Sequence, residues 1–119
     1  MERKYYKEVK KLLEKELQKQ EVISYRLLPV KISRDCGHFV VVTYPNGDSE
    51  AIANSDFVSL YKEEKGMYVG KRSHKFLKWG GDTFIYDDMI FAPGAMVCVD
   101  CASMFIAISA EKFSRKYYR

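Results

Sequence analysis

The residues best suited to bind a metal ion fall in two tight pairs. All three cysteines and one of the two histidines lie in a C-x-H motif at residues 36–38 and a C-x-x-C motif at residues 98–101. Thiolate sulfur and imidazole nitrogen are usual ligands of Zn²⁺, and four such ligands complete a closed tetrahedral site. Residues two apart on an extended strand face the same side, so the C-x-H pair can reach one ion. The sequence therefore predicts a structural Zn²⁺ held by Cys36, His38, Cys98 and Cys101.

The elements that must position these ligands begin with a helix and continue with strands. Apolar residues at helical spacing predict an amphipathic helix over residues 2–20, with lysines covering its other face. Alternation predicts a strand over residues 23–28, and β-branched residues predict another over residues 38–44, closed by the turn residues 45–48. Residues 49–54 fit either a return strand or the start of a helix.

The second half of the chain has weaker signals. We expect a helix over residues 55–64, a short strand at 67–70, a basic loop or short helix at 71–81, a tight hairpin over 83–91, and a strand at 95–99 that ends in the C-x-x-C motif. Residues 101–117 fit either a strand with a short helix or one long helix. Together these elements predict an α+β fold: a single compact domain, residues 1–119, with an N-terminal helix and a mainly antiparallel sheet, stapled by the metal.

Composition restricts where such a protein acts. No stretch approaches the roughly 18–20 apolar residues of a membrane span, and the charged N-terminus does not resemble a secretory signal. The sequence therefore predicts a cytoplasmic protein with no membrane partner, in which reduced thiols bind metal rather than form disulfides. A net charge of +4 permits binding to nucleic acid or to an acidic protein without requiring either.

Two basic, aromatic segments are candidate binding surfaces. One surrounds Phe76, and the other is the C-terminal end of the chain. Interleaved cations and aromatic rings suit a nucleic-acid strand with stacked bases, whereas the alternative is a solvated basic face anchored in the core by Phe76, Leu77 and Trp79. Because Tyr, Trp and Arg carry much of the energy of protein interfaces, we favour a protein partner and treat nucleic acid as second. The predicted partner-binding residues are Lys71, Arg72, Lys75, Lys78, Trp79, Tyr117 and Tyr118.

Residues 95–102, AMVCVDCA, suggest a catalytic alternative. This segment resembles the P-C-x-x-C-A segment of zinc-dependent cytidine and dCMP deaminases, and the order of the predicted elements is similar to that of the family. The resemblance implies a zinc-activated water and a proton-shuttling Glu within an H-x-E motif. This chain has no H-x-E, its nearest counterpart being Asp48-Ser49-Glu50, and Pro93 lies too early to match the family's proline. If the zinc is structural instead, Glu50 is expected to be an ordinary surface residue.

A thiol enzyme is a further alternative. Cys101 follows Asp100 at a candidate helix N-terminus, where its thiol pKa would be lowered, and His38 could act as its base. This interpretation leaves Cys36 and Cys98 without a role, so the metal site explains more of the residues.

The short length, the metal-ligand pairs and the Lys/Glu/Tyr-rich N-terminal helix resemble those of small metal-binding anti-CRISPR proteins of phages and mobile elements. The resemblance implies a non-enzymatic inhibitor that occludes a protein surface of a Cas9-type nuclease in the host cytoplasm. The sequence thus predicts a zinc-stabilised binding protein, an inhibitor in preference to an enzyme, with a nucleobase deaminase and a small nucleic-acid-binding module as alternatives.

Overall fold

A computed structural model describes residues 1–100 and 105–119 of the chain, and its fold is α+β, as predicted. An N-terminal helix precedes strands that pair in an antiparallel manner, apart from one isolated parallel bridge between Arg3 and Ile85. Contacts group these residues into two compact units, Met1–Tyr25 with His74–Ser114 and Arg119, and Arg26–Ser73 with Arg115–Tyr118. The single domain over residues 1–119 stays a prediction.

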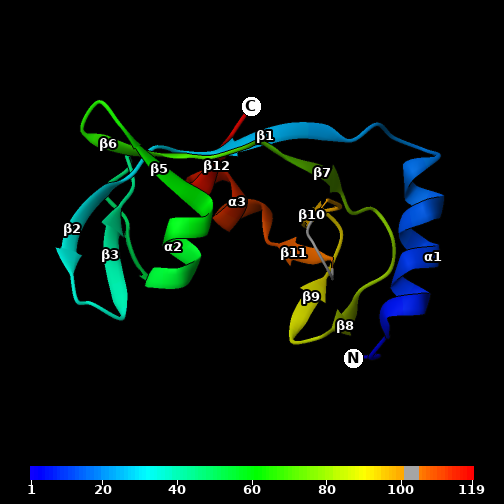
Figure 1. Cartoon of the computed structure of the whole chain (residues 1–119). Coiled ribbons are helices and arrows are strands. Elements are labelled where there is room, and N and C mark those ends of the chain that lie inside the picture. Colours follow the sequence, from blue (N-terminus) through cyan, green and yellow to red (C-terminus); the bar gives the residue numbers. More distant parts are fainter. Residues whose placement is uncertain (101–104) are drawn as a thin grey trace. The chain divides into compact units, whose positions relative to one another are not determined.

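The first unit consists of an antiparallel sheet, a hairpin, one complete helix and part of a second (Figure 1). Its sheet has the order β11-β10-β7-β1, with residues 23–25 of β1 pairing with β7. Its elements are α1 (Tyr6–Leu17), the first residues of β1 (Ile23–Leu27), β7 (His74–Lys78), β8 (Phe84–Tyr86), β9 (Met89–Phe91), β10 (Met96–Cys98), β11 (Ile106–Ile108) and the first part of α3 (Ala110–Lys116).

The core of the first unit lies between one sheet face, α1 and the β8–β9 hairpin. Leu77 and Val97 pair across β7 and β10 and are fully buried with Val9 and Leu13 of α1. The Trp79 ring packs edge-on against Phe84 and Phe91 of the hairpin, at centroid distances of 5.7 and 5.6 Å. Val9 and Leu13 lie four apart, so both face the sheet from one side of the helix. This face of the sheet is thus the apolar one.

The second unit contains a three-stranded sheet, a second hairpin and a short helix. Its elements are the end of β1, β2 (Lys31–Asp35), β3 (Phe39–Thr43), β4 (Ser49–Ala53), α2 (Asn54–Leu60), β5 (Tyr61–Glu64), β6 (Met67–Gly70), the end of α3 and β12 (Tyr117–Tyr118). Strands β2, β3 and β4 form one sheet, β5 pairs with β6, and the end of β1 pairs with β12. Val30, Val42 and Phe57 lie at its core.

A polar network crosses the core of the second unit. The Tyr44 hydroxyl donates to Glu50 at 2.7 Å, and Lys116 Nζ lies 3.1 Å from the same carboxylate. The expectation that Glu50 is an ordinary surface residue is therefore wrong, because its carboxylate ties β4 to a buried tyrosine and to α3. The Tyr61 hydroxyl is buried beside this network and has no hydrogen-bond partner among the described residues.

Several local expectations are confirmed and three are wrong. The hairpin over residues 83–91 and the strand ending at Cys98 are present, and residues 49–54 resolve into β4 followed by α2. The predicted helix over 55–64 stops at Leu60, and its last residues form β5, whose hairpin turns at Lys65 and Gly66 with positive φ angles of 52° and 82°. The basic segment at 71–81 contains strand β7, whose Phe76 and Leu77 are buried on opposite faces. The helix expected over 2–20 is shorter, because Lys4 bonds instead to the hairpin carbonyl of Ile85.

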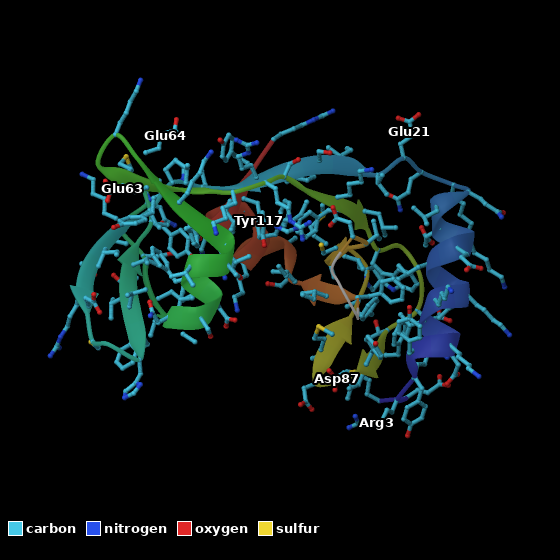
Figure 2. All side chains as sticks on the ribbon, in the orientation of Figure 1. Arg3, Glu21, Glu63, Glu64, Asp87 and Tyr117 are labelled. Carbon is cyan, nitrogen blue, oxygen red and sulfur yellow. The ribbon has the colours of Figure 1, made fainter. Side chains whose placement is uncertain are left out.

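Charged residues of loops, turns and strand β5 lie on the surface of each unit. Figure 2 shows Glu21 and Asp87 of the first unit and Glu63 and Glu64 of the second with carboxylates directed away from their own ribbons. Charge at these exposed positions avoids the desolvation that a buried, unpaired charge would suffer.

Burial raises the pKa of Tyr61 to about 12, and burial with the hydrogen bond to Glu50 raises the pKa of Tyr44 further. An unfolded tyrosine ionises near pH 10, so between about pH 10 and 12 the unfolded chain binds fewer protons than the folded one. Stability is therefore fully present below pH 10 and falls as pH rises toward 12. Between about pH 10 and 12, we expect the free energy of unfolding of the Tyr61→Phe variant to fall by on the order of 2 kcal/mol less than that of the native protein.

Urea unfolding at several pH values between 8 and 12, followed by Trp79 fluorescence, measures this difference. Tyr118→Phe, which alters an exposed hydroxyl, serves as the matched control. Equal slopes of unfolding free energy against pH for Tyr61→Phe and native protein would contradict the expectation.

Candidate metal centre

The register of β7 against β10 brings three potential metal ligands to one sheet face. Cys98 pairs with Phe76, and the ladder continues through the hydrogen bond from the Val99 amide to the Lys75 carbonyl at 2.9 Å. Extending this antiparallel register by one residue places Asp100 opposite His74. Because Cys98 and Asp100 are two residues apart, they share the face on which His74 lies.

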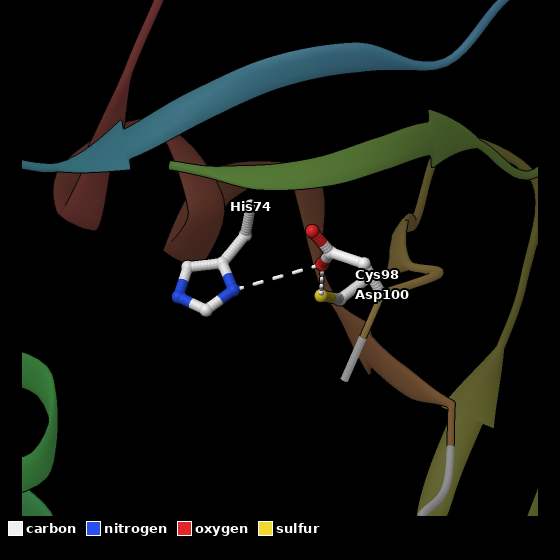
Figure 3. A group of neighbouring side chains, drawn as sticks. All are labelled: His74, Cys98 and Asp100. Atoms are coloured by element: carbon white, nitrogen blue, oxygen red, sulfur yellow. Dashed lines mark hydrogen bonds and ion pairs between the residues drawn. The ribbon is translucent and has the colours of Figure 1, made fainter. Parts of the chain in front are cut away.

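The three side chains converge at distances suited to a single ion (Figure 3). Asp100 Oδ1 lies 3.2 Å from Cys98 Sγ and 3.6 Å from His74 Nδ1, and the three ligand atoms all lie within 4.8 Å of one another. Ligands at zinc bond lengths in a tetrahedron are separated by about 3.3–3.5 Å. Small side-chain adjustments would therefore complete the geometry, and this cluster of His74, Cys98 and Asp100 could hold a metal ion.

Burial makes the imidazole of this cluster chemically unusual. His74 is only 8% exposed, and its Nδ1 has no hydrogen-bond partner among the described residues. The 3.6 Å separation from Asp100 permits charge attraction but is too long for a hydrogen bond. A buried polar atom without a partner costs free energy, so Nδ1 is a position where a bound cation would restore a favourable interaction.

The carboxylate of the cluster is held in its charged form. Burial by itself would raise the pKa of Asp100, but hydrogen bonds from the Cys98 thiol and the Lys75 backbone, with His74 nearby, lower it below its usual value. Asp100 is the most accessible of the three residues, with a side chain 33% exposed, whereas Cys98 is 2% exposed. The site thus offers one carboxylate at the surface and two buried soft or borderline donors.

The ligands predicted from the sequence are distributed differently. Cys98 lies in the first unit, whereas Cys36 and His38 lie in the second, and Cys101 is outside the described residues. The expectation that residues 36–38 form an extended strand is wrong. They make the turn between β2 and β3, with Gly37 at φ +83° and the His38 amide bonded to the Cys36 carbonyl. A Zn²⁺ bound by those four residues stays a prediction.

The predicted partner-binding residues divide between surface and core. Trp79 is 2% exposed and donates its indole N–H to the Asp82 carbonyl, so the expectation that it is exposed is wrong. Tyr117 is half-buried against the core of the second unit, whereas Tyr118 is 44% exposed. The exposed cationic candidates are Lys71 and Arg72 in the second unit and Lys75 and Lys78 in the first. Burial of Phe76, Leu77 and Trp79 confirms that aromatic and apolar residues of this segment anchor it in the core.

The basic segment at the C-terminal end of the chain has fewer cations available to a partner than its composition indicates. Arg115 lies 3.7 Å from Asp48, and Lys116 contacts Glu50. Two of its cations therefore face carboxylates of their own unit.

Sequence reasoning missed His74 and Asp100 because it treated C-x-x-C as the ligand motif. The i, i+2 pair of Cys98 and Asp100 was a signal for ligands on one strand face. Finding His74 also required knowing that residues 74–78 form a strand and which strand it pairs with, and the lysine-rich sequence there concealed both.

Comparisons with known proteins provide no evidence on the role of this site. No family model, no curated protein and no solved structure matches this chain. Among the described residues, no helix has the length and apolar character needed to cross a membrane.

The unpartnered imidazole yields a test that needs no metal. With a chelator and a reductant at pH 8, we expect His74→Leu to leave the free energy of unfolding unchanged or to raise it by about 1 kcal/mol, since the substitution removes a buried atom that lacks a hydrogen bond. Chemical denaturation followed by circular dichroism measures the change. His38→Leu, at an exposed turn position, is the control. A loss of stability confined to His74→Leu would mean that the metal-free imidazole makes favourable contacts.

Proposed function

We propose that this chain is a zinc-stabilised binding protein that acts on a protein partner without catalysing a reaction, and that His74, Cys98 and Asp100 bind the zinc. The observation that carries the proposal is the buried His74 Nδ1, which lacks a hydrogen-bond partner among the described residues while it lies near a carboxylate and a thiol. Two of these ligands differ from those that the sequence alone predicts.

The ligand types favour zinc among common cations. Magnesium and calcium prefer oxygen ligands throughout, whereas thiolate and imidazole together suit zinc. Because metal binding to such a site requires a folded arrangement of β7 and β10, the binding free energy adds to the stability of the fold.

Three protein ligands leave a fourth coordination position open, as in catalytic zinc sites, but burial favours a structural role for this metal. Cys98 and His74 are buried, so substrate access to the nucleophilic thiol is poor. The deaminase alternative also needs a proton-shuttling Glu, and Glu50 accepts hydrogen bonds from Tyr44 and Lys116 in the second unit. These observations support a binding function.

The partner we propose, on the anti-CRISPR resemblance, is a protein of the Cas9-type nuclease class in the cytoplasm. Its contacts would come from the exposed predicted residues rather than from the buried Trp79. Nucleic acid is the second candidate, since the same exposed lysines could contact phosphates. The residues that remain candidates for the partner surface are Lys71, Arg72, Lys75, Lys78 and Tyr118.

The first test compares the two histidines of the chain. Purified under reducing conditions, the native protein should contain about one zinc per chain by elemental analysis, and chelation should lower its melting temperature. We expect His74→Leu to lose the zinc and its stabilisation, and His38→Leu to retain both. Cys98→Ser and Cys36→Ser form a second matched pair with the same expectation. Loss of zinc from the His38→Leu and Cys36→Ser variants would support the ligands predicted from the sequence instead. A native protein that contains no zinc would contradict the proposal.

The second test concerns the partner surface. Lys71→Glu with Arg72→Glu, and separately Lys75→Glu with Lys78→Glu, should weaken binding to a Cas9-type nuclease by tenfold or more if the face is central, a loss of about 1.4 kcal/mol. Lys10→Glu with Lys11→Glu on the exposed side of α1 is the charge-matched control. The loss should persist at high salt, because a packed protein interface is less salt-dependent than phosphate contacts. Tight, strongly salt-dependent binding of DNA or RNA by the native protein would favour the nucleic-acid alternative.

A further inference from the structure

Strand β4 has an open edge in the three-stranded sheet of the second unit. Among the described strands, it pairs with β3 alone. Their ladder is closed at one end by the Tyr44 amide bonded to the Asp48 carbonyl, and at the other by the Asn54 amide bonded to the His38 carbonyl. Hydrogen-bonded and non-bonded pairs alternate along an antiparallel ladder, and the register between these two ends has no shift. Counted from either end, the residues of β4 whose N–H and C=O groups point away from β3 are Ser49, Ala51 and Ala53.

These outward backbone groups have no hydrogen-bond partner among the described residues, and the side chains beside them are small and exposed. The strand also lacks the usual protection of an edge, since it contains no proline, no lysine and no bulge. Its one charged residue, Glu50, lies on the other face, where Tyr44 and Lys116 pair with it. An additional strand could therefore pair with β4 through its backbone.

The opposite edge of the same sheet is protected. A register shift between Ile32 and Arg34 places a bulge in β2, and three of the five residues of this strand are charged. Val30, which precedes the strand, exchanges two hydrogen bonds with Tyr68 of β6, at 2.8 and 2.9 Å. A bulge, charge and a covering strand all oppose the addition of another strand. The open edge is thus particular to β4.

The sheet face beside this edge is apolar at its centre. Val40 and Val42 are buried in the core, so the alternate residues of β3, Phe39 and Val41, lie on the outer face. Phe39 is 40% exposed, and the residues of β4 that pair with Phe39 and Val41 are alanines, which cover little of either. Large apolar side chains of a strand added beside β4 would reach past these alanines to Phe39 and Val41.

The charge on this outer face is positive. Lys31 pairs with Thr43 and Arg34 pairs with Val41, so both cations of β2 share the face of their partners. None of the residues that the register places on this face of β2, β3 and β4 is acidic. A second copy of β4 would bring only serine and alanine to the face. A segment with aspartate or glutamate would instead be attracted by the two cations over roughly 10 Å, the distance at which salt screens charge.

We propose that the protein partner adds an extended, acidic segment to β4, with its backbone paired to the open edge and its large apolar side chains on Phe39 and Val41. The proposal rests on the proposed function in that the partner is a protein, and it does not depend on the zinc site. A peptide backbone presents donors and acceptors at the spacing of the outward groups of β4. A nucleic-acid strand has no such array of donors, and its phosphates would meet the outward carbonyls.

A synthetic peptide tests the edge directly. The capped peptide Asp-Thr-Phe-Thr-Val-Thr-Asp carries its apolar and acidic side chains on one face, as the outer face of the sheet requires. Titrated into the ¹⁵N-labelled full chain, it should shift the amide resonances of Ser49, Ala51 and Ala53 and leave those of α1 unchanged. The same peptide with its central amides N-methylated should not bind, because it cannot donate hydrogen bonds to the edge.

Ala53→Pro tests the same contact from the side of the protein. The φ angle of Ala53 is −55°, which suits proline, and its N–H points outward, so the substitution removes no hydrogen bond between β3 and β4. We expect the affinity for the peptide and for a Cas9-type nuclease to fall roughly tenfold or more. Ala53→Ser, which keeps the amide, is the matched control, and circular dichroism establishes that both variants fold.

The cations of the outer face provide a second variant that leaves the edge intact. Lys31→Glu with Arg34→Glu should weaken peptide binding roughly threefold at low salt and less at high salt, since these charges act through solvent. Lys10→Glu with Lys11→Glu on α1 is the charge-matched control.

The outcomes separate this proposal from the proposed function. Nuclease binding that is equal for native protein and Ala53→Pro would overturn the role of β4 and leave a protein-binding function. Peptide binding at β4 without any nuclease binding would support the edge and overturn the proposed partner. A peptide that does not bind, or that binds equally well when N-methylated, would overturn the edge proposal. Shifts of the β4 amides that depend on protein concentration alone would assign the edge to a second copy, and shifts caused by single-stranded DNA would assign it to nucleic acid; either would overturn the proposal.

Discussion

The antiparallel register between β7 and β10 is the constraint on which the rest of the first unit depends. It pairs Leu77 with Val97 on one face and Phe76 with Cys98 on the other, and its continuation sets Asp100 against His74. Side chains alternate along a strand, so a slip of one residue would move every one of them to the opposite face. The burial of Leu77 and Val97 against α1 therefore fixes the register, and the register assembles the metal cluster. The site is a consequence of core packing on the far side of the same two strands.

The two faces of this sheet consequently differ in composition and in packing. The face toward α1 and the β8–β9 hairpin carries the apolar core of the unit, with the tightly packed rings around Trp79. The opposite face is a mixture of aromatic rings and polar groups, with Phe113 of α3 packed on Tyr25 and Phe76 and a cavity alongside. Function is expected on the second face, since a loosely packed layer can change state while the first face keeps the strands paired. The position of His74 on this face follows from the alternation of β7.

The sequence was sufficient for the α+β class, the N-terminal helix, the β8–β9 hairpin and the strand ending at Cys98, because each has a local periodic or turn signal. It was insufficient for β7, where lysines alternate with buried residues and a long-range pairing decides the conformation. For the same reason, only one of the three residues of the candidate site was predicted from the sequence. Cys98 belongs to a visible motif, whereas the partnership of His74 with Asp100 arises from two segments 26 positions apart that only pairing brings together. The prediction that residues 36–38 are extended was wrong because Gly37 adopts a turn conformation.

Two buried side chains with unsatisfied polar atoms differ in their surroundings. Tyr61 and His74 each bury a polar atom that has no hydrogen-bond partner among the described residues. The Tyr61 hydroxyl lies beside the Tyr44 and Glu50 network and, like any tyrosine at neutral pH, is uncharged, so its cost is that of a neutral group. His74 instead faces a thiol and a carboxylate whose charge is maintained by hydrogen bonds. A charged carboxylate beside a buried imidazole nitrogen that has no hydrogen bond among the described residues leaves that nitrogen unsatisfied, and a cation that replaced the thiol proton would interact favourably with all three groups. This unsatisfied nitrogen, rather than the count of cysteines, is the physical reason to propose that a metal ion could bind between β7 and β10.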